Sequence, residues 1–148
     1  MSLKARISED VKQAMRAGDK LRLKTLRMVT AGIKQREVDE RIELDDSAVL
    51  AIVEKMIKQR RESAEQYRSG QRPDLAEAEE SEIDLLAAYL PEPLSAEELS
   101  AVIDEAVAEV GATDMAAMGA VMSLVKARVQ GRADMRDVSA RVRSRLSA

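Results

Sequence analysis

The stretch YLPEPLSAEEL, residues 89–99, divides the chain into two parts. Pro91 and Pro93 stand two residues apart, and each proline disfavours the helical conformation in the residue before it. Ser95 and Glu98 follow with the spacing of a capping box, in which each side chain accepts a hydrogen bond from the other residue's backbone N–H at the start of a helix. The sequence therefore predicts a helix that ends before Pro91, an extended segment, and a new helix that begins after Ser95.

On the N-terminal side of this stretch, apolar residues recur with the helical period of about 3.6 residues. Gly18 and Gly70 are expected helix stops, Asp19 is an expected N-cap, and Pro73 suits the first turn of a helix, where its missing N–H does no harm. Gly32 lies inside the second helical pattern and costs about 1 kcal/mol relative to alanine, so we expect a close helix contact there. The last two of the four predicted helices should form an antiparallel hairpin. The four helices span about residues 2–17, 20–38, 46–69 and 73–90.

On the C-terminal side, the same period predicts three helices over about residues 96–110, 114–129 and 135–146. The whole chain has no Trp, no Phe and only two Tyr, so its core must consist of Leu, Ile, Val, Met and Ala, the mixture typical of packed helices. The predicted fold is all-α and multihelical, with two different helical subdomains over residues 1–91 and 92–148.

The residue types exclude several kinds of catalytic site. The chain has no Cys and no His, so it has no thiolate nucleophile, no disulfide and no imidazole base or metal ligand. None of the six glycines is followed by Lys, as a phosphate-binding loop requires, and the carboxylates of residues 73–84 are spread around a helix rather than gathered for a metal ion. We therefore expect no metal, no cofactor and no catalysis by the chain alone.

The sequence also bears on the compartment of the protein. It has neither an N-terminal apolar segment of the signal-peptide kind nor a run of about 18 apolar residues. On this basis we expect a cytoplasmic protein that does not bind membranes.

Charge is distributed in blocks, although the net charge is only −3. Residues 1–36 carry ten Lys/Arg and three Asp/Glu, residues 73–114 carry thirteen Asp/Glu and no Lys/Arg, and residues 115–148 carry seven Lys/Arg and two Asp/Glu. Basic ends around an acidic middle fit a nucleic-acid surface built from both ends, or blocks that attract each other or cover solvated helix faces. In the second predicted helix, four cations lie within roughly 80° of one another, opposite the apolar side: Lys20, Lys24, Arg27 and Lys34.

Cations also gather around the predicted turn at Gly131, where they are candidates for contact with RNA phosphates. Gly131 itself is expected to stop one helix, and Asp134 to cap the next. Because the chain has almost no aromatic residues to stack on bases, a folded RNA recognised by the shape of its backbone fits better than a single strand. Alternatively, the arginines cover helix ends and bridge to the acidic middle. The candidate RNA-binding residues are Lys126, Arg128, Arg132, Arg136 and Arg141.

Four stretches resemble the YqeY family: AGDKLRLKTLRM at 17–28, YLPEPLSAEEL at 89–99, MGAVM at 118–122 and GRADMRDVS at 131–139. The resemblance covers nearly the whole chain in order. The C-terminal part of this family is similar to the tail domain of the B subunit of the bacterial aspartyl/glutamyl-tRNA amidotransferase. The resemblance implies a two-subdomain all-α fold and a relation to glutamine-dependent carbon–nitrogen ligation on charged tRNA. In that enzyme the tail helps to hold the tRNA, while the ATP-using and glutaminase chemistry lies elsewhere.

Carried over to this chain, the resemblance marks Gly119, Met122, Gly131, Arg132, Ala133 and Asp134 as motif positions. Two positions depart from the family pattern, because Ala120 and Gln130 stand where Lys is frequent. Arg136 keeps a positive charge where Lys is usual.

These observations lead to three functional hypotheses. The first is a non-catalytic module of the amidotransferase-tail type that binds tRNA and acts with a protein partner of the amidotransferase or translation machinery. The second is a protein-interaction or adaptor module that uses its acidic and basic helices. The third, implied only by the resemblance, is a carbon–nitrogen ligase with glutamine as amido-N-donor.

Overall fold

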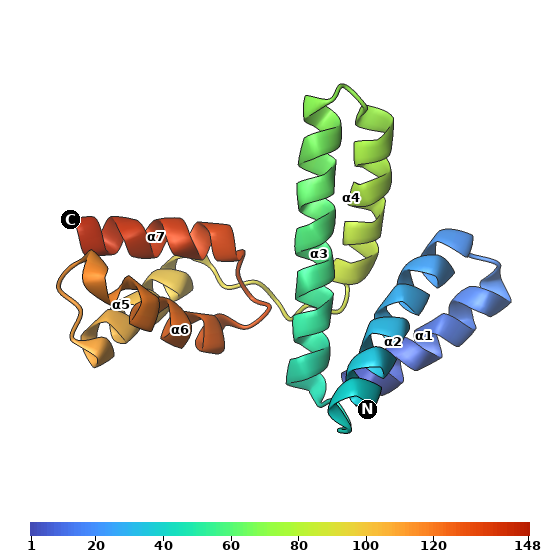
Figure 1. The fold of residues 1–148 in the computed structure, drawn as a ribbon, viewed down its shortest axis with the longest axis horizontal. Coiled ribbons are helices and arrows are strands. Elements are labelled where there is room, and N and C mark those ends of the chain that lie inside the picture. The colour runs from blue at the N-terminus through green and yellow to red at the C-terminus, as the bar shows by residue number, and fades with distance from the viewer. The chain divides into compact units, whose positions relative to one another are not determined.

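The computed structural model describes residues 1–148, which form seven α-helices, one 3-10 helix and no strand (Figure 1). The predicted all-α class is confirmed. The helices fall into two compact units, an N-terminal unit of residues Met1–Leu90 and a C-terminal unit of residues Pro91–Ala148. The first contains α1 (Leu3–Ala17), α2 (Lys20–Glu40), α3 (Asp46–Ser69) and α4 (Pro73–Ala87). The second contains α5 (Ala96–Val110), η1 (Met115–Ala117), α6 (Met118–Val129) and α7 (Met135–Ser147).

No single helix is long and apolar enough to cross a membrane. Taken together, α5 and residues Met115–Val129 reach the required length and composition, but they form a pair bent by 98°.

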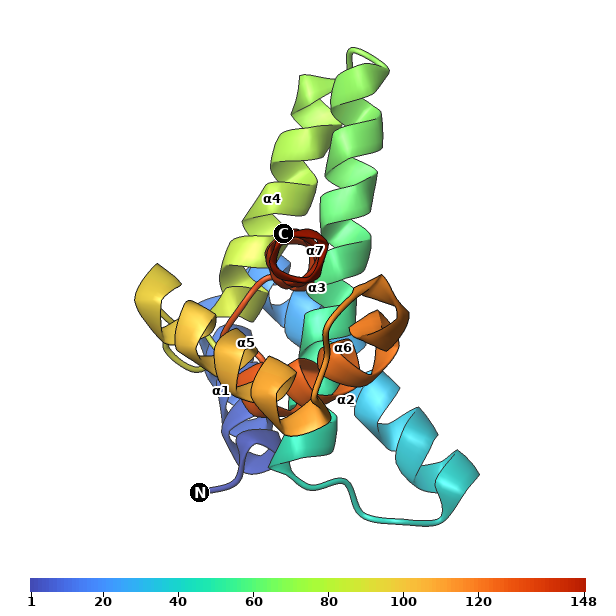
Figure 2. The ribbon, with the colours of Figure 1, turned by 90° about the vertical axis from the view of Figure 1, so that its left-hand side faces the viewer.

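The N-terminal unit consists of two helical hairpins. Both views show α3 and α4 side by side and antiparallel, as the short connection predicted (Figures 1 and 2). Arg60 of α3 is buried, and its Nε donates to Oε2 of Glu82 on α4 at 3.0 Å. Its Nη1 also donates to the Met56 carbonyl at 3.1 Å. The surrounding core is almost wholly aliphatic: Ile7, Leu26, Val29, Ile33, Leu44, Val49, Val53, Ile57 and Leu86, with Tyr89.

The C-terminal unit packs α5, α6 and α7 around an aliphatic core of its own. The capping box predicted at its start is present, because Oγ of Ser95 accepts from the Glu98 N–H at 3.1 Å and Oε1 of Glu98 accepts from the Ser95 N–H at 3.2 Å. Leu94, which precedes the box, packs against the same core. The buried residues are Leu99, Ile103, Ala106, Val107, Val121, Val125, Val129, Val138, Val142 and Leu146.

The single helix predicted over residues 114–129 is two pieces, a 3-10 turn followed by α6. Asp114 has an extended backbone, and its carboxylate accepts a hydrogen bond from the Ala116 N–H at 3.0 Å. This cap holds a tight first turn before the α-helix begins at Met118, an arrangement common at helix N-termini.

The joint between α6 and α7 has the local structure that the sequence predicted. After α6 ends at Val129, Gly131 takes a left-handed conformation with φ of 76°. Asp134 then caps α7, because its Oδ1 accepts from the Arg136 N–H at 2.9 Å. The GRAD sequence is therefore a helix stop followed by a helix cap.

We predict that Asp134→Ala lowers the free energy of unfolding by about 0.5–2 kcal/mol, because the Arg136 N–H at the start of α7 loses its hydrogen-bond acceptor. Asp134→Asn should lose far less, since asparagine caps helices equally well. Urea unfolding followed by circular dichroism measures both values. Equal stability of the alanine variant and the native chain would show that the cap contributes nothing.

Gly32 lies where α2 touches α3, as expected, but the approach is not close enough to require glycine. A Cβ built there would meet Cγ2 of Ile52 at 3.6 Å, an ordinary van der Waals distance. At Gly111, which ends α5, the backbone itself favours glycine, because its φ of 69° lies in the left-handed region.

We predict opposite effects of alanine at these two glycines. Gly32→Ala should raise the free energy of unfolding by about 0.5–1 kcal/mol through helix propensity. Gly111→Ala should lower it by about 1–2 kcal/mol, because an L-residue is strained at positive φ even where space is open. Urea unfolding of the two variants tests this, and destabilisation by Gly32→Ala would reveal a tighter helix contact.

Tyr89 closes the N-terminal unit just before the two prolines. Its ring is buried, and its hydroxyl donates to Oδ2 of Asp10 at 2.5 Å. The guanidinium of Arg6 lies 4.8 Å from the ring centroid and donates to the Ala88 carbonyl at 3.1 Å. Burial, and after it the hydrogen bond to Asp10, raises the pKa of Tyr89 to about 12.

This pKa predicts an alkaline weakening of the N-terminal unit. The folded-state pKa of Tyr89 lies above the ordinary tyrosine value of about 10, so the contribution of the neutral phenol is fully present below pH 10 and is lost as the pH rises towards 12. In a Tyr67→Phe variant only Tyr89 absorbs as phenolate, and its titration midpoint should lie near pH 12. A midpoint near pH 10 would be incompatible with the buried, hydrogen-bonded hydroxyl.

Candidate nucleic-acid interface

The five predicted RNA-binding cations all lie in the C-terminal unit, on α6, on α7 or in the turn between them. The buried valines of α6 and α7 turn these helices so that the charged positions face outwards. Lys126 and Arg128 lie in the last turn of α6, Arg132 lies in the turn, and Arg136 and Arg141 lie on α7. Gly119, in the first turn of α6, is exposed, and a Cβ built there would meet no atom within 4 Å. Packing therefore does not require a glycine at that position.

Arg132 makes hydrogen bonds with the extended segment that contains the two prolines. Its Nε donates to the Glu92 carbonyl at 2.8 Å, and its own carbonyl accepts from the Leu94 N–H at 2.8 Å. Hydrogen bonds from the Ser95 backbone N–H, and secondly from the Ser95 hydroxyl, lower the pKa of Glu98. The positive charge of Arg132 lowers this pKa by a smaller amount. Arg132 is thus engaged within the unit, a role that sequence reasoning missed because its partners are some 40 residues away.

Arg128 and Arg141 each have a carboxylate partner. Arg128 pairs with Glu109 of α5, and Nε of Arg141 lies 3.1 Å from Asp137, one turn earlier on α7. Arg145, which was not among the predicted residues, pairs with Asp104 of α5 at 3.2 Å. Two of these pairs bridge the basic C-terminal block to the acidic middle, as the alternative interpretation of the charge blocks expected.

These ion pairs lie at the surface. The side chains of Glu109 and Asp104 are 55% and 63% exposed, and that of Asp137 is 54% exposed. Pairs of this kind contribute about 0–1 kcal/mol each, so a phosphate can replace the carboxylate at little cost.

Other cations are more accessible. Lys126 and Arg143 are exposed and have no ion-pair or hydrogen-bond partner within the structure. Arg136 is exposed as well, and its backbone N–H belongs to the Asp134 cap.

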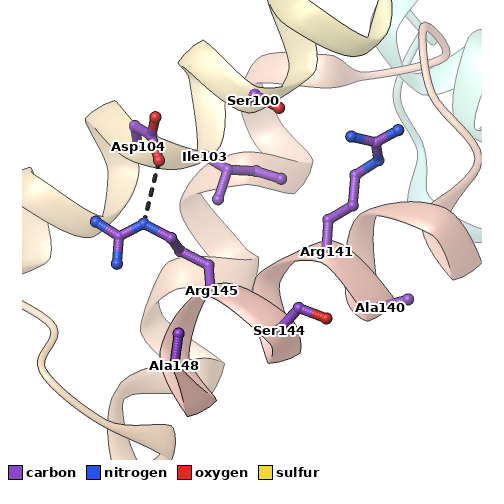
Figure 3. Close-up of a pocket in the computed structure, with 8 residues that line it drawn as sticks. All are labelled: Ser100, Ile103, Asp104, Ala140, Arg141, Ser144, Arg145 and Ala148. Carbon is purple, nitrogen blue, oxygen red and sulfur yellow. Dashed lines mark hydrogen bonds and ion pairs between the residues drawn. The ribbon is translucent and has the colours of Figure 1, made fainter.

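An open cleft of about 480 Å³ lies between α5 and α7 (Figure 3). Figure 3 shows Arg141 and Arg145 rising from α7 on either side of Ile103, with Arg145 reaching Asp104. Two guanidinium groups, two hydroxyls and the Asp104 carboxylate therefore surround an apolar floor. The lining residues are Ser100, Ile103, Asp104, Ala140, Arg141, Ser144, Arg145 and Ala148.

No three Asp or Glu side chains come together in an arrangement that could hold a metal ion. The C-terminal unit presents guanidinium, ammonium and hydroxyl groups at its surface, beside the carboxylates of Asp104, Glu109 and Asp137.

Comparison with known proteins gives three informative relatives, each named altered inheritance of mitochondria protein 41, mitochondrial. That of Lachancea thermotolerans is 41% identical over 87 residues, which is 58% of this chain and 46% of that protein. That of Eremothecium gossypii is 38% identical over 112 residues, 74% of this chain and 61% of that protein. That of Pyrenophora tritici-repentis is 31% identical over 128 residues, 83% of this chain and 71% of that protein.

The names of these relatives correct one expectation. They are mitochondrial proteins by name, so the cytoplasmic location predicted from the sequence is wrong. That prediction rested on the distribution of apolar residues in the sequence, which does not identify a compartment.

The names describe no catalytic activity, and the chain spans 46% and 61% of the length of the first two relatives. A family model described as Yqey-like protein matches residues 4–146, almost the whole chain. The chain therefore belongs to the YqeY-like family.

Proposed function

We propose that this protein is a non-catalytic helical module that binds folded RNA of the tRNA class through its C-terminal unit. By resemblance, this unit corresponds to the tail domain of the tRNA amidotransferase B subunit. The observation that carries the proposal is a set of cations on two rigid helices whose partners are absent or exposed: Lys126, Arg128, Arg141, Arg143 and Arg145.

Phosphates suit these side chains for a physical reason. A guanidinium binds a phosphate through two parallel hydrogen bonds, which are stronger than a single contact with an exposed carboxylate. Binding also releases counterions from the RNA, and this favourable term is larger for each additional phosphate neutralised. The cleft beside Arg141 and Arg145 adds the hydroxyls of Ser100 and Ser144, which can donate to further phosphate oxygens.

A folded RNA is favoured over a single strand because the C-terminal unit has no aromatic residue. The only aromatic side chains of the chain are Tyr67 and Tyr89, and both belong to the N-terminal unit. Proteins that bind single strands stack bases on aromatic side chains, whereas helical RNA is recognised mostly through its shape, its phosphates and its 2′-hydroxyls.

A carbon–nitrogen ligase reaction needs activation of the acceptor and release of ammonia from glutamine. This chain has no Cys to serve as a thiolate nucleophile and no His to serve as an imidazole base. In the proposed role, the chain holds the RNA and a protein partner performs any glutamine-dependent chemistry.

Binding of deacylated tRNA, followed by fluorescence anisotropy at several salt concentrations, tests the proposal. If about 4–6 phosphates are contacted, log affinity should fall with log salt with a slope of roughly −4 to −5. Lys126→Gln combined with Arg143→Gln should reduce the magnitude of that slope by about 2, because two phosphate contacts are removed. Neither side chain has a partner in the structure, so the fold should remain intact.

The matched control combines Lys12→Gln with Lys58→Gln, which removes the same charge from α1 and α3. Both control residues are exposed, and the only partner of either is Glu9, 3.9 Å from Lys12. Equal losses in the two double variants would indicate an effect of net charge alone. Binding that is absent at low salt, or insensitive to salt, would refute the proposal.

A protein-interaction module is the second candidate function, and one observation favours it. Glu77 and Asp84 are exposed on the same side of α4 and have no ion-pair partner, so this side of the helix presents two carboxylates to a basic partner. Retention of a protein partner after nuclease treatment, together with no affinity for tRNA, would favour this function over the first.

A further inference from the structure

The outer face of α2 carries a row of four cations, three of which have no ion-pair partner in the structure. At about 100° per residue, Lys20, Lys24, Arg27 and Lys34 lie within roughly 80° of one another around the helix. The opposite side of α2 is buried in the core of the N-terminal unit through Leu26, Val29 and Ile33. The row is therefore presented outwards by a helix that cannot rotate.

No carboxylate of α2 neutralises this row. Glu37, Asp39 and Glu40 each lie roughly 100° or more from the centre of the row around the helix. Glu37 is engaged with Lys4 at 2.7 Å and with the Leu44 N–H at 2.9 Å, while Glu40 is bound to Arg36 at 2.7 Å.

Neighbouring elements add only one weak contact. Lys20, Arg27 and Lys34 are exposed and have no ion-pair or hydrogen-bond partner. Lys24 lies 3.9 Å from Glu82 of α4, and its side chain is 70% exposed. The arginines on the inner sides of the same helix behave differently, because Arg22 lies 3.7 Å from Asp10 and Arg36 is bound to Glu40.

Repulsion within the row therefore destabilises the isolated protein slightly. Like charges three or four residues apart on a helix repel each other by about 0.2–0.5 kcal/mol per pair, and Lys20, Lys24 and Arg27 have this spacing. A ligand with closely spaced negative charges would remove the repulsion and release its own counterions.

We propose that this face of α2, from Lys20 to Lys34, is a second RNA-contact surface that binds the phosphate backbone of a folded RNA. The choice of RNA rests on the proposed function, but the residues belong to the other unit. Lys20 and Lys34 are fourteen positions apart, or about 21 Å along the helix axis. A nucleic-acid strand places one phosphate about every 3.4 Å along a duplex axis, so several phosphates lie within reach of one straight row.

The face is less suited to a membrane or to an acidic protein. Helices that lie in a membrane surface insert a continuous apolar face. The continuous apolar face of α2 is buried within its unit, and its exposed apolar side chains, Leu21, Met28 and Val38, are separated along the helix by basic and polar residues. Protein interfaces are depleted of lysine at their centre and enriched in aromatic residues, whereas this face has three lysines and no aromatic residue.

The test combines Arg27→Gln with Lys34→Gln in the full chain and measures binding to deacylated tRNA across salt concentrations. The magnitude of the slope of log affinity against log salt should fall by about 2, and affinity at low salt should fall by about tenfold or more. Circular dichroism should not change, because both side chains are exposed and glutamine is a good helix former. The Lys12→Gln, Lys58→Gln variant is the control, with the same charge removed from the same unit.

The C-terminal double variant, Lys126→Gln with Arg143→Gln, separates the two proposals. If it weakens binding while the α2 variant matches the control, the α2 surface is refuted and the proposed function stands. If only the α2 variant weakens binding, the α2 surface stands and the C-terminal unit is not the RNA-binding site. Native protein that does not bind tRNA refutes both.

Vesicles containing anionic phospholipid provide the remaining comparison. If the α2 variant loses binding to such vesicles but keeps the native affinity for tRNA, the occupant of this face is a membrane surface and the proposal is wrong. Unchanged vesicle binding together with reduced tRNA affinity supports it.

Discussion

Pro91 and Pro93 impose a constraint that the rest of the chain must accommodate. Two backbone N–H groups are missing within three residues, so no helix can continue through this segment. The remaining backbone carbonyl and N–H groups of this segment still need hydrogen-bond partners, and Arg132 provides two of them. Its guanidinium donates to the Glu92 carbonyl, and its carbonyl accepts from the Leu94 N–H. One residue of the α6–α7 turn thereby holds the entry to α5, and the three helices of the C-terminal unit are tied together where the segment would otherwise be loose.

Local signals made most of the helical structure predictable from the sequence. The Ser95–Glu98 box, the Asp134 cap and the glycine stops each depend on residues within one turn of the chain, and the structure contains them. The 3-10 turn before α6 was missed because helical periodicity does not distinguish a tight first turn from an α-helical one. Ion pairs between residues far apart in the sequence were not predictable, because the order of charges along the chain does not determine which carboxylate each arginine contacts.

That limit mattered for the candidate site. The sequence put Arg132 among the RNA contacts and left Arg143 and Arg145 outside the set, whereas the structure engages Arg132 within the unit and leaves Arg143 without a partner. The charge blocks were visible in the sequence, but only the fold shows which of them neutralise each other. The C-terminal arginines have α5 beside them, and the outer cations of α2 have almost no acidic neighbour.

The buried pair between Arg60 and Glu82 has a consequence for the α3–α4 hairpin as a whole. An ion pair with side chains only 8% and 12% exposed adds little net stability, because desolvation offsets the attraction. A buried guanidinium without its carboxylate, however, costs about 3–5 kcal/mol. Sliding one helix along the other by a turn would separate the two groups. The pair therefore favours the one alignment of α3 and α4 in which the guanidinium and the carboxylate meet.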